Sequence, residues 1–149
     1  MRRRILVPLD GSSGSEAILP RVAELARGEH ATVRLLFVAP PAQARVAPDG
    51  RILVYADQEA ARLAENARAY LMRAAAALAG IDVQLAVRFG DPAAEILDEA
   101  DSGGVDLIAM ATHQRTGLRR LLEGSVAEHV ERLAHVPVLL VGRGAPVPA

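Results

Sequence analysis

Short runs of apolar residues recur along the chain, and residues that favour turns end each run. Runs of this length between turn formers are typical of strands that are buried on both faces. We therefore predict five strands, over residues 4–9, 32–38, 82–87, 106–111 and 136–141. Between them, apolar positions repeat with helical spacing, which predicts four helices, over residues 13–28, 57–79, 92–102 and 125–133.

The alternation of strands and helices predicts one α/β domain over residues 1–149. We expect a Rossmann-like fold in three layers, in which an open twisted sheet of five mainly parallel strands has helices on both faces. A sheet of this kind binds ligands beyond the carboxyl ends of its strands, at the point where the strand order reverses. The loops that follow the strands are therefore the places to look for function.

Several residues predict where the helices begin and end. Gly28 is a natural stop for the first helix, and Pro20 predicts a distortion of its first turns. Gly103 and Gly104 end the third helix in the same way. Two pairs have the spacing of a capping box at a helix start, namely Ser13 with Glu16 and Ser125 with Glu128.

The segment over residues 39–56 joins the second strand to the second helix and follows neither pattern. Pro48, Asp49 and Gly50 lie between two short, partly apolar pieces of it. Turn formers in that position predict a flap or a hairpin.

Composition narrows the functions that this fold can have. The formal net charge of −1 gives no broad basic surface for nucleic acid. The chain has no cysteine, and all 17 of its Lys and Arg positions are arginine, which excludes thiolate chemistry, a Walker lysine and a Schiff base. No uncharged run approaches the roughly 18 residues that cross a bilayer. We therefore expect a cytoplasmic protein that binds neither nucleic acid nor membrane.

Two loops lie where a ligand is expected, and they cover residues 10–15 and 112–125. The second loop ends at Gly124 and Ser125, where the last helix is predicted to begin and where its free N–H groups would attract phosphate. The basic residues around it outnumber the acids, with His113, Arg115, Arg119 and Arg120 against Glu123. The alternative is an ordinary capped helix with solvated arginines.

Three segments of the chain resemble the universal stress protein family. They are Val7 to Ser12, which reads VPLDGS, then Gly90 to Pro92, and then Thr112 to Val126. The resemblance covers essentially the whole chain and implies a fold like that of the adenine nucleotide α-hydrolases. For nucleotide-binding members it also implies the pattern G-x-x-G-x9-G-[ST], whose glycines let the backbone approach the phosphates. This chain keeps the spacing but replaces two of the three glycines, since the positions hold Ala111, Gln114, Gly124 and Ser125.

The resemblance also implies a role for individual residues. Asp10 would bind the adenine or ribose side, and Val38 and Met110 would pack near the base, beside Pro8. Backbone N–H groups from Gly124 to Val126 would bind the phosphates. The complete predicted site has no catalytic residue and no metal ligand, and it consists of Pro8, Asp10, Val38, Met110, Ala111, His113, Gln114, Arg115, Gly124, Ser125 and Val126.

Each of these assignments has a purely structural alternative. Asp10 is also a former of Asx turns at the end of a strand, and Val38 and Met110 are also ordinary core residues. Gln114 either obstructs the phosphates or donates a hydrogen bond to them through its amide. The sequence leaves these alternatives open.

The resulting hypothesis is a stress or signalling module that binds ATP, with Mg²⁺ carried by the nucleotide, and that acts as a homodimer joined through residues 136–141. A binding protein is favoured over an enzyme, because no carboxylate is placed by sequence to activate water beside the γ-phosphate. Slow ATP hydrolysis and a nucleotide-free dimeric scaffold are the two alternatives. Replacement of the glycine positions by Ala111 and Gln114 favours the scaffold.

Overall fold

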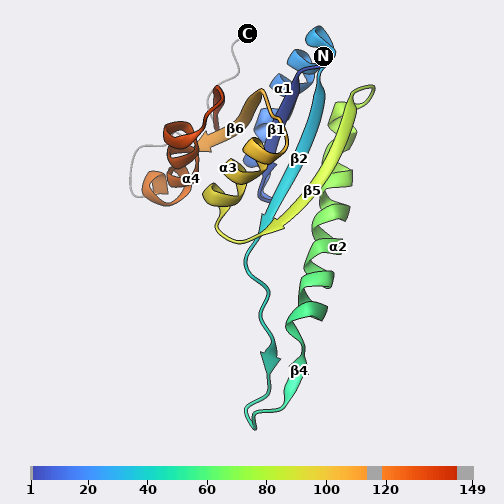
Figure 1. Ribbon diagram of the computed structural model, residues 1–149, viewed down its shortest axis with the longest axis vertical. Coiled ribbons are helices and arrows are strands. Elements are labelled where there is room, and N and C mark those ends of the chain that lie inside the picture. Colours follow the sequence, from blue (N-terminus) through green and yellow to red (C-terminus); the bar gives the residue numbers. More distant parts are fainter. Residues whose placement is uncertain (1, 114–118, 144–149) are drawn as a thin grey trace.

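The computed structural model describes residues 2–113 and 119–143, with side chains described for residues 2–112 and 125–142. Its main feature is a sheet of five parallel strands in the order β5-β2-β1-β6-β7 (Figure 1). The strands are β1 (Arg4–Leu9), β2 (Thr32–Ala39), β5 (Asp82–Phe89), β6 (Leu107–His113) and β7 (Val138–Arg143). The predicted α/β fold with a parallel five-stranded sheet is confirmed.

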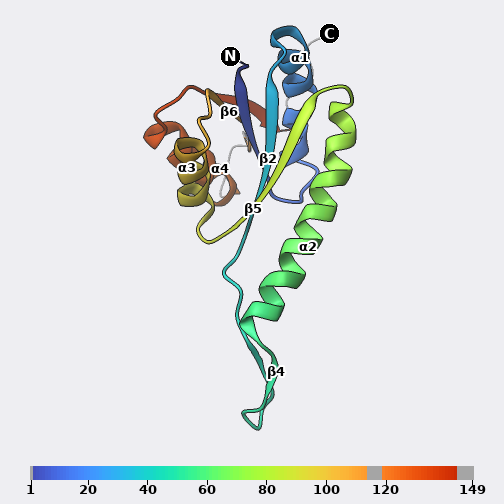
Figure 2. The ribbon, with the colours of Figure 1, turned by 45° about the vertical axis from the view of Figure 1, so that its right-hand side comes forward.

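The helices cover the sheet on both faces and divide the core into two clusters. Helices α1 (Leu19–Glu29) and α2 (Ala56–Ala74) pack on one face, where Val22 and Leu71 are fully buried. Helices α3 (Pro92–Ser102) and α4 (Arg119–Leu133) pack on the other face, and there Ile96 and Val130 are buried (Figures 1 and 2). Strand β1 contributes Val7 to the first cluster and Leu6 to the second, because successive side chains of a strand point to opposite faces.

The start of the first helix differs from the prediction. Residues Ser15–Ile18 form a separate 3-10 turn, η1, and α1 begins only at Leu19, with Pro20 in its first turn. The expected distortion at Pro20 is therefore confirmed, because proline is tolerated in the first turn but breaks a helix interior. The capping box at Ser13 is wrong: the residue before η1 is Gly14, and it makes no side-chain capping hydrogen bond.

Two other helix ends also differ from those predicted from the sequence. Helix α1 runs past Gly28 to Glu29, and His30 ends it in the left-handed conformation with φ of 52°. Helix α4 begins at Arg119, so Ser125 lies inside this helix and not at its start. The predicted capping box of Ser125 with Glu128 is therefore wrong.

The ends of α3 follow the sequence closely. The Asp91 side chain accepts a hydrogen bond from the Ala94 N–H at 3.0 Å, which caps the first turn, and Pro92 is the first helical residue. Gly103 is the residue after the last turn, as predicted. Helix α2 is shorter than predicted and is followed by the 3-10 turn η2 (Ala75–Leu78).

Residues 40–55, here called the arm, form a hairpin that projects away from the sheet (Figures 1 and 2). Its two short antiparallel strands are β3 (Arg45–Val46) and β4 (Ile52–Val54), and they make a separate two-stranded sheet. Of the two alternatives for this segment, the structure shows the hairpin. The arm leaves the body at the carboxyl end of β2 and returns through α2.

Within the parts of the chain that the structure describes, none of the helices has the length and apolar character needed to cross a membrane.

Candidate functional site

A pocket of about 300 Å³ lies at the carboxyl ends of the central strands. Strand β1 pairs with β2 on one side and with β6 on the other, so the chain order reverses on the two sides of β1. Crevices at such a reversal are the usual ligand sites of parallel α/β sheets. The lining residues come from the ends of β1, β2 and β6, the loop after β1, and α3 and α4: Pro8, Leu9, Asp10, Ser12, Ser15, Leu36, Val38, Pro92, Ile96, Met110, Ala111, Val126 and Ala127.

The polar part of the pocket is the turn that follows β1. The Asp10 carboxylate accepts hydrogen bonds at Oδ1 from the Ser12 N–H at 2.8 Å and from the Ser12 hydroxyl at 2.6 Å. The Ser15 hydroxyl donates to the Ser12 carbonyl and accepts from the Asp10 N–H. This is an Asx turn, so the structural role that we considered for Asp10 is present. It also fixes the carboxylate at the edge of the pocket, and a fixed carboxylate can accept a hydrogen bond from a ligand.

A second contact ties the segment after this turn to α2, on the same face of the sheet. The Tyr70 hydroxyl on α2 donates a hydrogen bond to the Glu16 carboxylate of η1 at 3.0 Å, and the Tyr70 ring packs edge-on against Phe37. Burial, together with the bond to Glu16, raises the pKa of Tyr70 to about 12. The tyrosine therefore stays neutral at physiological pH and holds α2 against the segment that follows the pocket turn.

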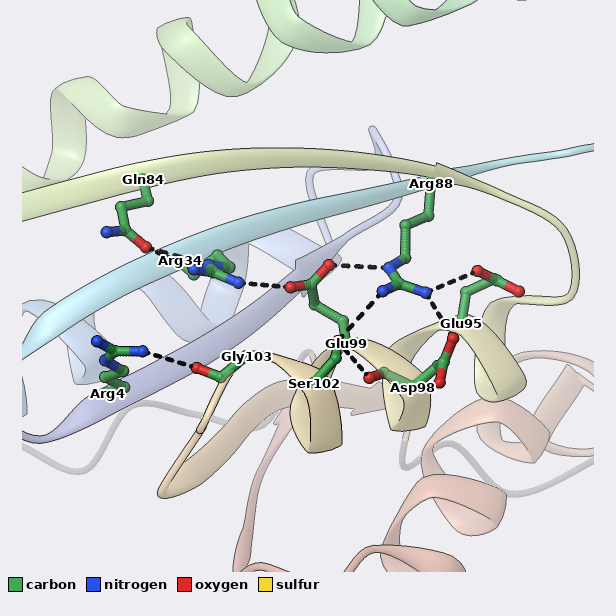
Figure 3. Close-up of polar contacts among 9 residues, drawn as sticks. All are labelled: Arg4, Arg34, Gln84, Arg88, Glu95, Asp98, Glu99, Ser102 and Gly103. Atoms are coloured by element: carbon green, nitrogen blue, oxygen red, sulfur yellow. Dashed lines mark hydrogen bonds and ion pairs between the residues drawn. The ribbon is translucent and has the colours of Figure 1, made fainter.

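A charged network holds α3 on the sheet (Figure 3). Glu99, which is 7% exposed, accepts hydrogen bonds from Arg34 of β2 and from Arg88 of β5. Arg88 also contacts Glu95 at 3.1 Å and Asp98 at 2.8 Å. Polar side chains thus attach the middle of α3 to the sheet edge, where an apolar contact would be expected in a fold of this class. Because Pro92 and Ile96 of the same helix line the pocket, the network also positions one pocket wall.

The Glu99 carboxylate is ionised in this network. Its burial disfavours the charged form, but the hydrogen bonds from Arg88 and Arg34 outweigh burial and hold the pKa of Glu99 below its usual value of 4.5. The same bonds raise the pKa of Arg88. The charges are therefore a permanent part of the fold at neutral pH.

Six of the residues that the sequence assigned to the site line this pocket, namely Pro8, Asp10, Val38, Met110, Ala111 and Val126. Ser125 is half-buried on α4, next to the lining residue Val126. His113 is the last residue of β6, and Gly124 lies within α4. Gln114 and Arg115 lie outside the described residues.

The position of α4 corrects one physical argument for phosphate binding. The free N–H groups of a helix belong to its first four residues. In α4 these are residues 119–122, so the N–H groups of Gly124 and Ser125 have acceptors inside the helix. The predicted helix start at Gly124 is therefore wrong, and the free N–H groups of the helix are not those of Gly124 and Ser125.

Seven of the lining residues were not predicted from the sequence as site residues: Leu9, Ser12, Ser15, Leu36, Pro92, Ile96 and Ala127. Signals for some of them were available. Ser12 and Pro92 lie in the segments that carry the family resemblance, and Ser15 lies in a predicted ligand loop. Leu36, Ile96 and Ala127 look like any other core position, because only the packing of α3 and α4 leaves space beside them.

Residues 1–142 match the family model of the universal stress protein family. The chain belongs to this family. One relative of this universal stress protein is the universal stress protein MJ0531 of Methanocaldococcus jannaschii. The two are 32% identical over 146 residues, which cover 93% of this chain and 81% of the relative.

Solved structures of similar proteins show the same arrangement of elements. The structure of MJ0577, also from Methanocaldococcus jannaschii, has a TM-score of 0.78 and 29% identity, and the match covers 98% of this universal stress protein and 99% of MJ0577. A universal stress protein solved in complex with cAMP has a TM-score of 0.69 and 22% identity, with 96% and 98% of the two chains covered. At that identity the second comparison shows the shared fold alone.

Proposed function

We propose that this universal stress protein binds an adenine nucleotide, with ATP as its ligand, and acts as a dimeric switch in a stress or signalling response. The observation that carries the proposal is the pocket at the reversal of strand order, which brings together six residues that the family resemblance assigned to a nucleotide. A structurally similar universal stress protein was solved with cAMP, which contains the same adenosine unit. A ligand that binds one conformation of a protein more tightly shifts the protein toward that conformation, so binding and release of a nucleotide can act as a switch.

The chemistry of the lining suits the two parts of an adenosine. Val38, Met110 and Ile96 supply apolar surface against which a flat base can be buried, as is usual for small-molecule sites. Asp10 accepts a hydrogen bond from a ribose hydroxyl or from the adenine amino group. At about 300 Å³, the pocket is at the lower end of the volumes typical of small-molecule sites, so the phosphates extend beyond it.

In this proposal the phosphates lie toward the carboxyl end of β6 and toward α4. The N–H groups of Gly124 and Ser125 are hydrogen-bonded within the helix, so the proposal relies on side chains for the phosphates. These are the Ser125 hydroxyl and one or more of His113, Arg115 and Arg119. Mg²⁺ accompanies the nucleotide and is bound through its phosphates. The absence of a carboxylate assigned to the γ-phosphate favours binding over hydrolysis.

Isothermal titration calorimetry of ATP binding tests the proposal directly. We expect a dissociation constant on the order of micromolar for the wild-type protein, since a few charge-assisted hydrogen bonds added to base burial reach that affinity. Gln114→Gly is expected to change the dissociation constant of ATP by a smaller factor than a substitution that removes the apolar surface around the base. Tighter binding in Gln114→Gly would mean that the glutamine obstructs the phosphates, and weaker binding would mean that it binds them.

The two alternative functions make different predictions about the purified protein. Mass spectrometry of the nucleotide released on denaturation should give intact ATP for the switch, ADP alone for a slow ATP hydrolase, and no nucleotide for the scaffold. The scaffold replaces the proposal if the wild type fails to bind millimolar ATP while the double variant Ala111→Gly with Gln114→Gly binds it.

We also propose that two copies pair through β7. Strand β7 is an edge of the sheet, and the residues from Val138 to Val141 are uncharged and half-buried. An exposed apolar edge favours pairing with another strand. Sedimentation velocity at micromolar concentration should give a dimer for the wild type and a monomer for Leu139→Arg. Leu133→Arg, at an exposed position of α4, is the matched control and should remain a dimer. A wild-type monomer, or an unchanged dimer in Leu139→Arg, would overturn this part of the proposal.

A further inference from the structure

The arm exposes an unusual amount of apolar surface. Four of the six exposed large apolar residues of the described chain belong to it: Val46 at 57%, Ile52 at 51%, Leu53 at 62% and Tyr55 at 57%. The arm projects away from the main sheet and from α3 and α4 (Figures 1 and 2), and in the described part of the chain these four side chains are more than half exposed. Clustered exposed apolar residues on a projecting element mark a surface that another molecule covers.

The two strands of the arm do not pair with the main sheet in the part of the chain that the structure describes. In the described residues, β3 and β4 pair only with each other, over two and three residues, with an irregularity between Arg45 and Val46. A two-stranded hairpin is marginally stable in water, and three or more strands with an apolar face are needed for independent stability. The outer edge of β4 is therefore suited to accept a further strand.

The sequence around β4 is complementary to itself. Side chains alternate along a strand, so Leu53 lies on one face of β4 while Ile52 and Val54 share the other. Arg51 precedes β4 and Tyr55, whose backbone is also extended, follows it, so the alternation continued by one residue at each end puts both on the face of Leu53. When two copies of this segment run antiparallel about Leu53, Leu53 faces Leu53 of the second copy and Ile52 faces Val54. The same register places Arg51 beside Tyr55 of the second copy, twice.

We propose that the arms of two copies pair antiparallel through β4, with Leu53 at the two-fold axis. The electrostatics match at both ends of the pairing, because a guanidinium over a tyrosine ring is a favourable cation–π contact. The Arg51 side chain is 78% exposed, and its ion pair with the exposed Asp49 is of the kind that contributes little, so Arg51 is free to turn toward the ring. Cross-strand pairs of aromatic, β-branched and apolar side chains then stabilise the four-stranded unit.

The arm contact is separate from pairing through β7. The arm follows β2, whereas β7 lies at the end of the sheet beyond β6. A single strand pair buries less than the surface that stable complexes need, so we expect a weak, reversible contact that joins dimers at high protein concentration. Sedimentation at micromolar concentration therefore reports β7, and the two pairings can fail independently.

Disulfide trapping tests the arm contact, because the chain contains no cysteine of its own. In the proposed register the two residues 53 lie directly across from each other, at a separation that a disulfide can span. Leu53→Cys oxidised with oxidised glutathione at about 100 µM protein should therefore form a disulfide-linked pair about tenfold faster than a randomly colliding cysteine, since pairing raises the effective thiol concentration. The rate is read from non-reducing gels.

Matched controls separate the register from chance collision. Met72→Cys, at a position of α2 that is 66% exposed, measures random collision. Ile52→Cys should be slow alone, but Ile52→Cys combined with Val54→Cys should cross-link rapidly, because these two positions face each other. The Leu139→Arg background should leave every rate unchanged. Equal rates for Leu53→Cys and Met72→Cys would overturn the proposal and leave the arm to a different partner, and equal rates for Leu53→Cys and Ile52→Cys would overturn the register.

Discussion

Replacing Val126 with aspartate is expected to weaken ATP binding by about 100-fold, which is close to 3 kcal/mol. Val126 lies on α4 and lines the pocket on the side toward which we place the phosphates. The aspartate would bring a negative charge next to the phosphates and would replace apolar surface with a group that loses its water on binding. Calorimetry of the variant, at the temperature and salt concentration used for the wild type, measures the loss.

The control for this prediction introduces the same aspartate on the same helix, at a position outside the pocket lining. His129 is exposed on α4 and is not a lining residue, so His129→Asp should change the dissociation constant by no more than about threefold. Circular dichroism should show both variants folded. Equal weakening by the two variants would mean that general charge repulsion acts on the nucleotide, and an unchanged affinity in Val126→Asp would place the nucleotide elsewhere.

Glu99→Ala is expected to destabilise the fold by about 3 kcal/mol and to lower the melting temperature by about 10 °C. The substitution removes the carboxylate that Arg34 and Arg88 share and leaves both guanidinium groups partly buried beside an empty space. Thermal unfolding followed by circular dichroism measures the change. Asp98→Ala removes another partner of Arg88, but Asp98 is 69% exposed, so its loss should cost less than about 1 kcal/mol.

The stability that comes from Glu99 should also depend on pH. The pKa of Glu99 is lower in the folded chain than its usual value of 4.5, so the folded state favours the ionised form. The contribution of Glu99 to stability is therefore fully present above the unfolded pKa and is lost as the pH falls below it, through the folded pKa.

Comparable melting temperatures for Glu99→Ala and Asp98→Ala at pH 7 would contradict the assigned role of Glu99.

The strands were predictable because their signal is local. The run from Arg4 to Leu9 was predicted with the bounds that the structure shows, since apolar residues fill it and Asp10 and Gly11 end it. The start of α4 was not predictable in this way. Ser125 and Glu128 have the spacing of a capping box, but the leucines at positions 121 and 122 extend the helical pattern backwards to Arg119. Helix propensity over that stretch prevails over a single possible cap.

Part of the pocket lining could be named from the sequence because the family resemblance carries it. Asp10 and Met110 were assigned through that resemblance, and both line the pocket at the carboxyl ends of β1 and β6. The charged network around Glu99 was not predicted, because Arg34, Arg88 and Glu99 are far apart in the sequence and each looks like a surface residue. Their meeting depends on the tertiary packing of α3 on β2 and β5.

The arginine in β5 has a consequence for how far copies of this chain can assemble. Arg88 points from this edge strand toward α3, and a strand added at that edge would have to accommodate the fixed charges beside it (Figure 3). The opposite edge, β7, has only apolar residues from Val138 to Val141. If two copies join through β7, the apolar β7 edge of each copy is covered by the other. The β5 edges, with the charges of Arg88 beside them, then lie at the two outer ends of the joined sheet. Growth through sheet edges then terminates at two copies, and a fibre cannot propagate by that route.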